Sequence, residues 1–382
     1  MRAIISMLAN NDAGGMLEYT LSGVHFGAGI FIPLLFLLAP LSYAFQERVM
    51  RLSLSTRRSY SGLVRAHIGR YAGLFSICAM AAGNILYIIT EFIGMTAPLV
   101  FSGLPLWAAS LVSLIFISAI TLLWDERRQD KIALFVGAVN ITFIIAAFMC
   151  KPDFSDISRF DFSPLIGGNK LILFILATIG NTIAPFMLFF QPDSESNPQK
   201  LKAERKSIAI GAILQPFFAA IAVICGAALV GQNADSSIKE VSPMIQAFAA
   251  QISPATGVLY AIGLFNAAWL AAITITRATT IQILSVCGRE KARVYTIVIN
   301  AALLLTGALV VQIPHISLSF FAVLTQIVGA VLLVPDLVYL AILTNSRKIM
   351  GNFVNTPRQC VISWGLVALF AIVAIAACYS VI

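Results

Sequence analysis

The sequence predicts an all-α protein that crosses a membrane many times. Hydrophobic residues make up 59% of the 382 residues, charged residues make up 11%, and the mean hydropathy is +0.91. A soluble domain carries about a quarter charged residues, so a water-soluble globule is excluded. Apolar runs of about 20 residues recur along the chain. Each is long enough for a helix across the bilayer and too long for a strand of a membrane β-barrel.

Eleven membrane spans are predicted from these runs. We place them at residues 1–22, 23–45, 71–96, 104–124, 131–150, 169–190, 207–231, 254–286, 294–312, 317–344 and 360–381. The first and sixth spans are broken, at Asn10-Asn11-Asp12-Ala13-Gly14-Gly15 and at Gly180-Asn181-Thr182-Ile183-Ala184-Pro185. In each half a broken span precedes four intact ones, and because five is odd the halves have opposite orientations. This predicts a five-plus-five inverted repeat of the leucine-transporter type.

The predicted repeats cover residues 1–150 and 169–344 of a single transport domain, 1–382, and 360–381 is an additional, appended helix. The connection at 46–70 is predicted to be a basic loop. The acidic loop at 151–168 is predicted to cap an outer vestibule, and the loop at 232–253 is polar.

The net charge is +8, and the distribution of the basic residues along the chain indicates the orientation of the protein in the membrane. Nineteen Lys and Arg residues lie in the connections on one side and four in those on the other, in strict alternation. The positive-inside rule then predicts a cytoplasmic N-terminus and an external C-terminus. The expected partner is therefore the lipid bilayer and not nucleic acid. We expect a monomer in the inner (plasma) membrane of a bacterial cell. Six scattered cysteines indicate neither a disulfide framework nor a zinc site, and no cofactor is expected.

Asp12 is the strongest candidate for a functional residue. An ionisable side chain inside a span is costly, so a functional role is the first hypothesis, and Gly14 and Gly15 allow the backbone to leave the helix. In the alternative, residues 1–12 are a short tail and Asp12 only caps a helix that begins at Ala13. The presence of a second broken span favours the hypothesis that Asp12 belongs to a binding site over the hypothesis that it only caps a helix. About nine residues precede the first break, too few for the inner half of the span to reach the cytoplasm.

Two further carboxylates lie within spans. Glu91 is expected near the outer end of the third span and Glu18 in the outer half of the first. Each is either a vestibule carboxylate that attracts cations or a buried acid hydrogen-bonded to a neighbouring span.

Arg277 and Asp336 lie eight or nine residues from the cytoplasmic ends of the eighth and tenth spans. Their similar depth and opposite charge predict a pair, either structural or part of an inner gate. Asn266 and Gln326 could face the transport pathway, although such residues are also common at helix interfaces.

These motifs, in this order, resemble the natural resistance-associated macrophage protein (NRAMP) family of divalent-metal transporters over essentially the whole chain. Asp12-Ala13-Gly14-Gly15 stands where that family has Asp-Pro-Gly-Asn, and Glu91-Phe92-Ile93-Gly94 where it has Glu-Val-Ile-Gly. Residues 181–187, Asn-Thr-Ile-Ala-Pro-Phe-Met, stand where it has Ala-Thr-Val-Met-Pro-His-Asn. The resemblance implies a metal site formed by Asp12, Gly15, the backbone carbonyl of Asn181, and Ala184.

The departures from the family pattern point to its divergent magnesium-transporting branch. Gly15 and Ala184 replace an Asn and a Met ligand, while Phe186 and Ile88 replace a His and an Asp of the proton pathway. Sulfur ligands select softer metals, whereas oxygen ligands and water suit Mg²⁺ and Mn²⁺. Since Mg²⁺ keeps several of its waters, Gly15 and Ala184 are expected to leave room for them.

We therefore expect a secondary transporter, not an enzyme, that carries largely hydrated Mg²⁺ or Mn²⁺ as substrate without proton coupling. One alternative is a proton-coupled Mn²⁺/Fe²⁺ transporter. Another is an organic-solute carrier on the same fold, such as one for amino acids, against which the charge of Asp12 argues. The last is a membrane scaffold or sensor that does not transport.

Overall fold

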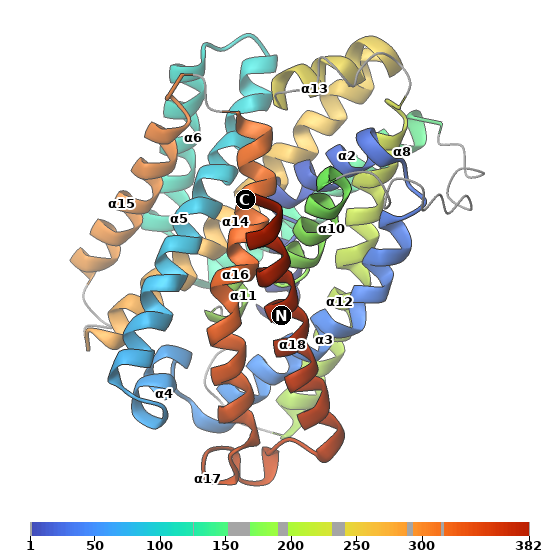
Figure 1. Cartoon of the computed structure of the whole chain (residues 1–382). Coiled ribbons are helices and arrows are strands. Elements are labelled where there is room, and N and C mark those ends of the chain that lie inside the picture. Colours follow the sequence, from blue (N-terminus) through green and yellow to red (C-terminus); the bar gives the residue numbers. More distant parts are fainter. Residues whose placement is uncertain are drawn as a thin grey trace.

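The computed structural model describes residues 2–124, 126–151, 169–189, 198–230, 241–288, 293–314 and 317–381. All regular structure in these residues is helical (Figure 1). The helices of the first half are α1 (Arg2–Ala9), α2 (Ala13–Phe26), α3 (Phe31–Thr56), α4 (Tyr60–His67), α5 (Arg70–Phe101), α6 (Leu106–Leu123), α7 (Glu126–Val139) and α8 (Ile141–Met149). Those of the second half are α10 (Asn169–Asn181), α11 (Pro185–Phe189), α12 (Pro198–Ala227), α13 (Val241–Ala247), η3 (Phe248–Ile252), α14 (Pro254–Val286), α15 (Arg293–Val310), α16 (Leu318–Asn345), α17 (Arg347–Met350), η4 (Gly351–Phe353) and α18 (Pro357–Val381).

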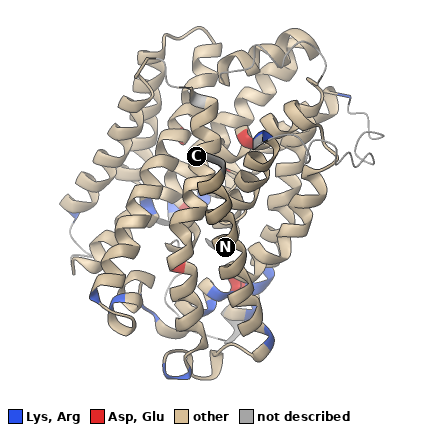
Figure 2. Cartoon of the chain, viewed as in Figure 1, with Lys and Arg blue, Asp and Glu red and all other residues tan. Residues whose placement is uncertain are grey.

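Nine segments within the described ranges are long and apolar enough to cross a membrane. The two remaining predicted spans correspond to the broken pair α1 and α2 and to α3. The predicted all-α polytopic fold is therefore confirmed. Lys and Arg gather at the end of the bundle that holds α4 and α17, as the alternating charges predict (Figure 2). We take this end as cytoplasmic.

The boundary predicted at 22/23 is wrong because Gly23 does not interrupt a helix. α2 runs on to Phe26 and ends at Gly27, whose φ of 70° is the left-handed conformation that glycine tolerates. A Cβ atom on Gly23 would overlap the backbone oxygen of Val223 on α12, and one on Gly226 would overlap that of Thr20. Gly23 and Gly226 therefore allow α2 and α12 to pack backbone against backbone, as small residues do between membrane helices.

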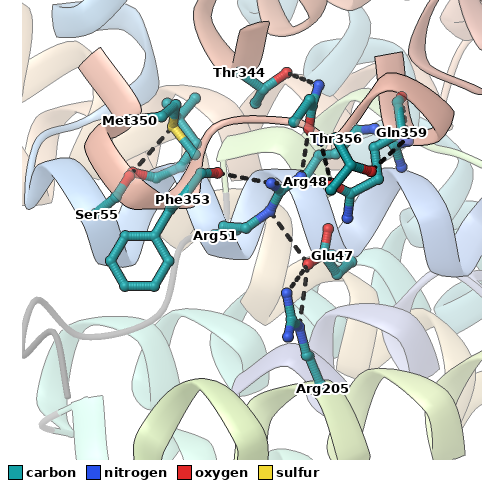
Figure 3. A network of polar contacts seen from close by, with 12 residues as sticks. Glu47, Arg48, Arg51, Ser55, Arg205, Thr344, Met350, Phe353, Thr356 and Gln359 are labelled. Carbon is teal, nitrogen blue, oxygen red and sulfur yellow. Dashed lines mark hydrogen bonds and ion pairs between the residues drawn. The ribbon is translucent and has the colours of Figure 1, made fainter. Parts of the chain in front are cut away.

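The connection predicted as a loop at 46–70 is mainly helical. α3 continues to Thr56, and α4 covers Tyr60–His67. The cytoplasmic part of α3 is held by Glu47, whose Oε1 accepts hydrogen bonds from Arg205 on α12 (2.8 Å) and pairs with Arg51 one turn further on (3.2 Å) (Figure 3). Charged residues thus remain helical here because they have partners on neighbouring elements.

The same network ties α18 into the bundle, although an appended helix was predicted. Arg51 donates to the backbone oxygen of Phe353 (2.7 Å) and to Asn355, both in the connection between α16 and α18. Arg48 donates to Ser363 on α18 (2.6 Å). The last helix is therefore fixed to α3 as well as packed against α16 (Figure 1).

The fifth span, predicted over 131–150, has a local irregularity at Asn140, where α7 ends and α8 begins, but Asn140 keeps helical backbone angles and Arg128–Met149 remains one segment able to cross the membrane. The predicted vestibule cap at 151–168 lies outside the described residues except for Lys151. The limits predicted for the two repeats and for the domain stay predictions.

Candidate functional site

The two helix breaks lie against each other, although 171 residues separate their asparagines. Asn10, between α1 and α2, donates through Nδ2 to the backbone oxygens of Asn181 (2.6 Å) and Thr182 (3.3 Å). Its Oδ1 accepts a hydrogen bond from the backbone N–H of Ala184 (3.1 Å). One side chain therefore satisfies three backbone groups that the end of α10 leaves without helical partners.

Asp12 lies at the start of α2 and is fully buried. Its Oδ1 accepts hydrogen bonds from the backbone N–H of Gly15 (2.5 Å) and from Nε2 of Gln326 (3.4 Å). Its Oδ2 is buried and has no hydrogen-bond partner among the described residues. Asp12 therefore caps α2, as expected if its role were only structural, but capping uses only one of its two carboxylate oxygens.

Asn181 faces Gly15 from the second break. A Cβ atom on Gly15 would overlap the side-chain amide of Asn181. Within the described structure neither Nδ2 nor Oδ1 of this buried amide forms a hydrogen bond. The amide lies close enough to the Glu18 carboxylate to interact with it, although no atom pair meets hydrogen-bond geometry. The expectation that Gly15 leaves space for water is therefore wrong, because Asn181 fills that space.

Ala184 follows the second break and is fully buried. Its N–H is held by Asn10, and its backbone oxygen accepts a hydrogen bond from Met187 (3.1 Å). Its methyl side chain offers no donor atom. Ala184 therefore limits the size of the site without supplying a side-chain ligand.

Glu91 does not lie near the outer end of its span, because α5 continues to Phe101. It is fully buried, and its Oε2 accepts a hydrogen bond from the backbone N–H of Ala13 (3.1 Å). Two carboxylates, Asp12 and Glu91, therefore meet the first N–H groups of α2, the end of a helix that favours negative charge. Of the two readings of Glu91, the buried acid bonded to a neighbouring span is confirmed.

Glu18 is also a buried acid bonded to a neighbouring span. Its Oε1 accepts hydrogen bonds from Thr178 on α10 (2.7 Å) and from Ser22 (2.9 Å). Its Oε2 has no hydrogen-bond partner in the described part of the chain.

Gln326 on α16 lies beside Asp12. It donates to the Asp12 carboxylate through Nε2 and accepts a hydrogen bond from the Tyr87 hydroxyl through Oε1 (3.0 Å). Asn266 does not reach the breaks with its hydrogen bonds. It donates instead to the backbone oxygen of Val136 (2.5 Å) and to Asn140 (2.7 Å) where α7 gives way to α8. Asn266 thus bonds to the α7–α8 junction, and the pathway role predicted for it stays a prediction.

The predicted pairing of Arg277 with Asp336 is wrong. Arg277 on α14 donates to Asp130 on α7 (2.6 Å), and both side chains are buried. Asp336 on α16 accepts a hydrogen bond from the Ser76 hydroxyl (2.6 Å) instead. Similar depth along two helices did not bring the side chains together because depth does not define which face of a helix a residue occupies.

Sequence reasoning missed the roles of Asn10 and Tyr87. The signal for Asn10 was available, since an amide in an unwound turn is a natural partner for exposed backbone groups. No three His, Cys, Asp or Glu side chains gather into a metal-binding cluster in the described residues. The breaks instead bring together buried oxygen atoms, among them one carboxylate oxygen, Oδ2 of Asp12, that has no hydrogen-bond partner in the described structure.

Similarity to known proteins covers nearly the whole chain. Residues 3–380 match the family described as natural resistance-associated macrophage protein-like (Nramp). This chain belongs to the Nramp family. Nramp membership confirms the resemblance seen in the motifs and places the chain among membrane transporters rather than enzymes.

Two Nramp relatives align at low identity. The divalent metal cation transporter MntH of Bacillus subtilis (strain 168) is 23% identical over 381 residues, which cover 95% of this chain and 87% of that protein. The natural resistance-associated macrophage protein 2 homolog of Dictyostelium discoideum is 24% identical over 347 residues, which cover 86% of this chain and 54% of that protein.

Solved structures show the same fold. The Eremococcus coleocola manganese transporter, in complex with an aromatic bis-isothiourea substituted compound, superposes with a TM-score of 0.81 at 17% identity, over 98% of this chain and 84% of that one. A Na⁺-coupled sialic acid symporter has a TM-score of 0.65 at 13% identity, over 97% of this chain and 88% of that one. The Nramp chain described here therefore has the leucine-transporter-type fold predicted from its two breaks.

Proposed function

We propose that this chain carries divalent metal cations across the membrane from a site between its two helix breaks. The observation that carries the proposal is the buried Oδ2 atom of Asp12, which the described structure leaves without a hydrogen-bond donor. A buried carboxylate oxygen is costly unless a donor or a cation meets it. A helix cap alone would leave this oxygen unexplained. Two similar proteins, the divalent metal cation transporter of Bacillus subtilis and the manganese transporter of Eremococcus coleocola, support the same substrate class.

Mg²⁺ is the first candidate ion and Mn²⁺ the second. Asp12 supplies the carboxylate oxygen without a hydrogen-bond partner in the described structure, and Ala184 contributes no sulfur or nitrogen donor from its side chain. Oxygen donors suit Mg²⁺ and Mn²⁺, whereas thioether and thiolate donors favour softer metals. Because Mg²⁺ dehydrates reluctantly and is commonly held by one or two carboxylates, the bound ion keeps part of its water.

Transport proceeds without proton coupling in this proposal. Phe186 and Ile88 are buried apolar side chains, and Phe186 packs against the ring of Tyr87 at 6.1 Å between centroids. Neither side chain can carry a proton. Entry is then driven by the ion gradient and by the membrane potential, which contributes about 2.3 kcal/mol per charge per 100 mV, and about twice that for a divalent ion.

Proton-coupled transport of Mn²⁺ or Fe²⁺ is the second candidate, and the position of Glu91 favours it. This carboxylate lies at the first break beside Asp12 rather than in an outer vestibule, so a proton acceptor adjoins the proposed metal site. Transport without proton coupling remains the first candidate, because Glu91 already accepts a hydrogen bond from the Ala13 N–H and so has a structural role. An amino-acid carrier ranks lower, since Asp12 would repel a substrate carboxylate.

Uptake into proteoliposomes tests the proposal. Reconstituted protein should take up Mg²⁺ and Mn²⁺, and Asp12→Ala should lose that uptake while remaining folded. Asp336→Asn is the matched control, because this buried carboxylate bonds to Ser76 and not to the breaks. Unchanged uptake by folded Asp12→Ala would overturn the site. Metal-dependent acidification of the lumen at clamped potential, absent from protein-free vesicles, would overturn uniport and establish the second candidate.

A further inference from the structure

We propose that the side-chain amide of Asn181 is a direct oxygen ligand of the transported cation, and that its backbone carbonyl is not. This inference rests on the proposed transport of divalent cations and assigns the ligand that the second break contributes. It concerns the position where Asn181 and Asp12 approach each other across Gly15.

The backbone oxygen of Asn181 is already engaged. It accepts the Nδ2–H of Asn10 at 2.6 Å, and the neighbouring Thr182 oxygen accepts hydrogen bonds from Asn10 (3.3 Å) and from Gln215 Nε2 (3.1 Å). The carbonyl groups freed by the end of α10 are therefore occupied by two side-chain amides. A ligand role for the Asn181 carbonyl would compete with this bridge between the breaks.

The side chain of Asn181 is in the opposite situation. It is fully buried, and neither of its polar atoms forms a hydrogen bond in the described structure. Buried amides are nearly always paired, so an exception calls for an explanation such as an ion. The amide lies over Gly15, whose N–H binds the Asp12 carboxylate. The unpaired amide and the unpaired Oδ2 of Asp12 therefore adjoin the same residue.

The neighbouring Glu18 bears on which amide atom can meet the cation. Glu18 lies close enough to Asn181 to interact with its side chain, and a carboxylate pairs with the amide nitrogen, which donates, rather than with the amide oxygen. In this proposal Nδ2 therefore faces Glu18 and Oδ1 faces the cation. A carboxylate oxygen with an amide oxygen and water is a ligand set suited to a hard divalent ion.

Gly15 is part of the same arrangement. Since a Cβ atom on residue 15 would overlap Asn181, any larger side chain at this position displaces the amide. Glycine is therefore required at residue 15 for Asn181 to reach the site, which gives the inference a second test that does not depend on removing the ligand.

Titration of purified full-length protein with Mg²⁺ and Mn²⁺, followed by metal-dependent thermal stabilisation, tests the inference. Asn181→Ala should weaken the apparent affinity for the metal by about tenfold or more. Changing a residue that only supports a metal ligand already costs about that much affinity, and losing a direct ligand should cost at least as much. Asn181→Asp, which adds a carboxylate, should retain or increase it. Asn266→Ala is the matched control, because that buried amide bonds to the α7–α8 junction and should leave the affinity unchanged.

A second experiment, which moves the amide from residue 181 to residue 15, tests the inference if Asn181→Ala folds poorly. Gly15→Ala alone should weaken metal binding by displacing the amide. The double variant Gly15→Asn/Asn181→Gly returns an amide to the same space from the opposite break. It should bind metal more tightly than the double variant Gly15→Ala/Asn181→Gly, which has no amide at either position. Equal affinity of these two double variants would overturn the inference.

The outcomes separate the inference from the proposed function. If Asp12→Ala abolishes metal stabilisation and Asn181→Ala leaves it unchanged, Asn181 is not a ligand and the transport proposal stands. If the parent protein shows no stabilisation by either ion, the proposed function itself fails and the inference falls with it.

Discussion

Asn10 and Asn181 join the two helix breaks through a 2.6 Å hydrogen bond from the side chain of the first to the backbone oxygen of the second. The bond connects α1–α2 in the first half of the chain to α10–α11 in the second. The bond therefore holds the breaks in one arrangement, which is how a site keeps its ligands positioned.

Replacing Asn10 should destabilise the protein. Asn10→Ala leaves the Asn181 oxygen and the Ala184 N–H without this partner, and an unpaired buried polar group costs about 1–3 kcal/mol. Thermal unfolding in detergent should show the loss. Asn11→Ala is the control, since Asn11 makes one side-chain bond, to the Gln215 oxygen (3.0 Å). An equal loss in both variants would show that Asn10 does not bridge the breaks.

Arg277 and Asp130 should be energetically coupled. Each single change, Arg277→Met or Asp130→Asn, disrupts a buried ion pair, and the double change should cost less than the sum of the two. We expect a coupling free energy of about 1–3 kcal/mol, measured from the unfolding of the four proteins of a double-mutant cycle.

The same cycle with Asp336→Asn in place of Asp130→Asn is the control. Its effects should add to those of Arg277→Met, because Asp336 bonds to Ser76. Coupling of Arg277 to Asp336 and not to Asp130 would contradict the observed pairing.

Ala184→Met should shift ion preference toward softer metals. A thioether beside Asp12 adds a sulfur donor and removes room for water, so Mn²⁺ and Cd²⁺ should gain over Mg²⁺ in competitive uptake. Ala184→Leu is the control, because leucine has a volume similar to that of methionine but no sulfur. It separates the effect of the sulfur donor from the effect of side-chain size. Equal preferences in Ala184→Met and Ala184→Leu would show that residue 184 does not contact the ion.

Glu47→Ala should destabilise the cytoplasmic end more than Arg205→Ala. Glu47 and Arg51 are almost fully buried, so removing the acid leaves a buried guanidinium without its counter-charge, at a cost of about 3 kcal/mol. The Arg205 side chain is 43% exposed, and losing an exposed partner costs about 1 kcal/mol or less. Thermal unfolding of the two variants gives the comparison, and the reverse order would contradict the network in Figure 3.

The fold was predictable from hydropathy and two interruptions because a bilayer admits few backbone arrangements. Asp12 was identifiable for the same reason, since a charge at such an interruption has few structural explanations. The partners of Arg277 and the position of Glu91 were not, because both depend on helix rotation and on where helices end. α5 extends five residues beyond the predicted end of its span at 96, and this alone moves Glu91 away from the membrane surface.

The helix irregularity at Asn140 was missed for a different reason. Its local sequence contains neither proline nor a pair of glycines, and the backbone oxygen of Val136 is satisfied by Asn266, which lies 130 residues away in the chain. An irregularity whose freed carbonyl is satisfied by such a distant partner leaves no local pattern. The predicted limit between the first two spans, at 22/23, was misplaced because Gly23 is a contact with α12 and not a helix end.

That contact constrains how this protein can move. Backbone atoms of α2 and α12 meet at Gly23 and at Gly226 with no intervening side chain, so sliding or separating the two helices would open a void along both. We therefore expect a tilt of α2 to carry α12 with it. Because Arg205 on α12 pairs with Glu47, such a displacement would also act on the cytoplasmic end of α3. A single alanine at residue 23 would wedge this unit apart far from the ion.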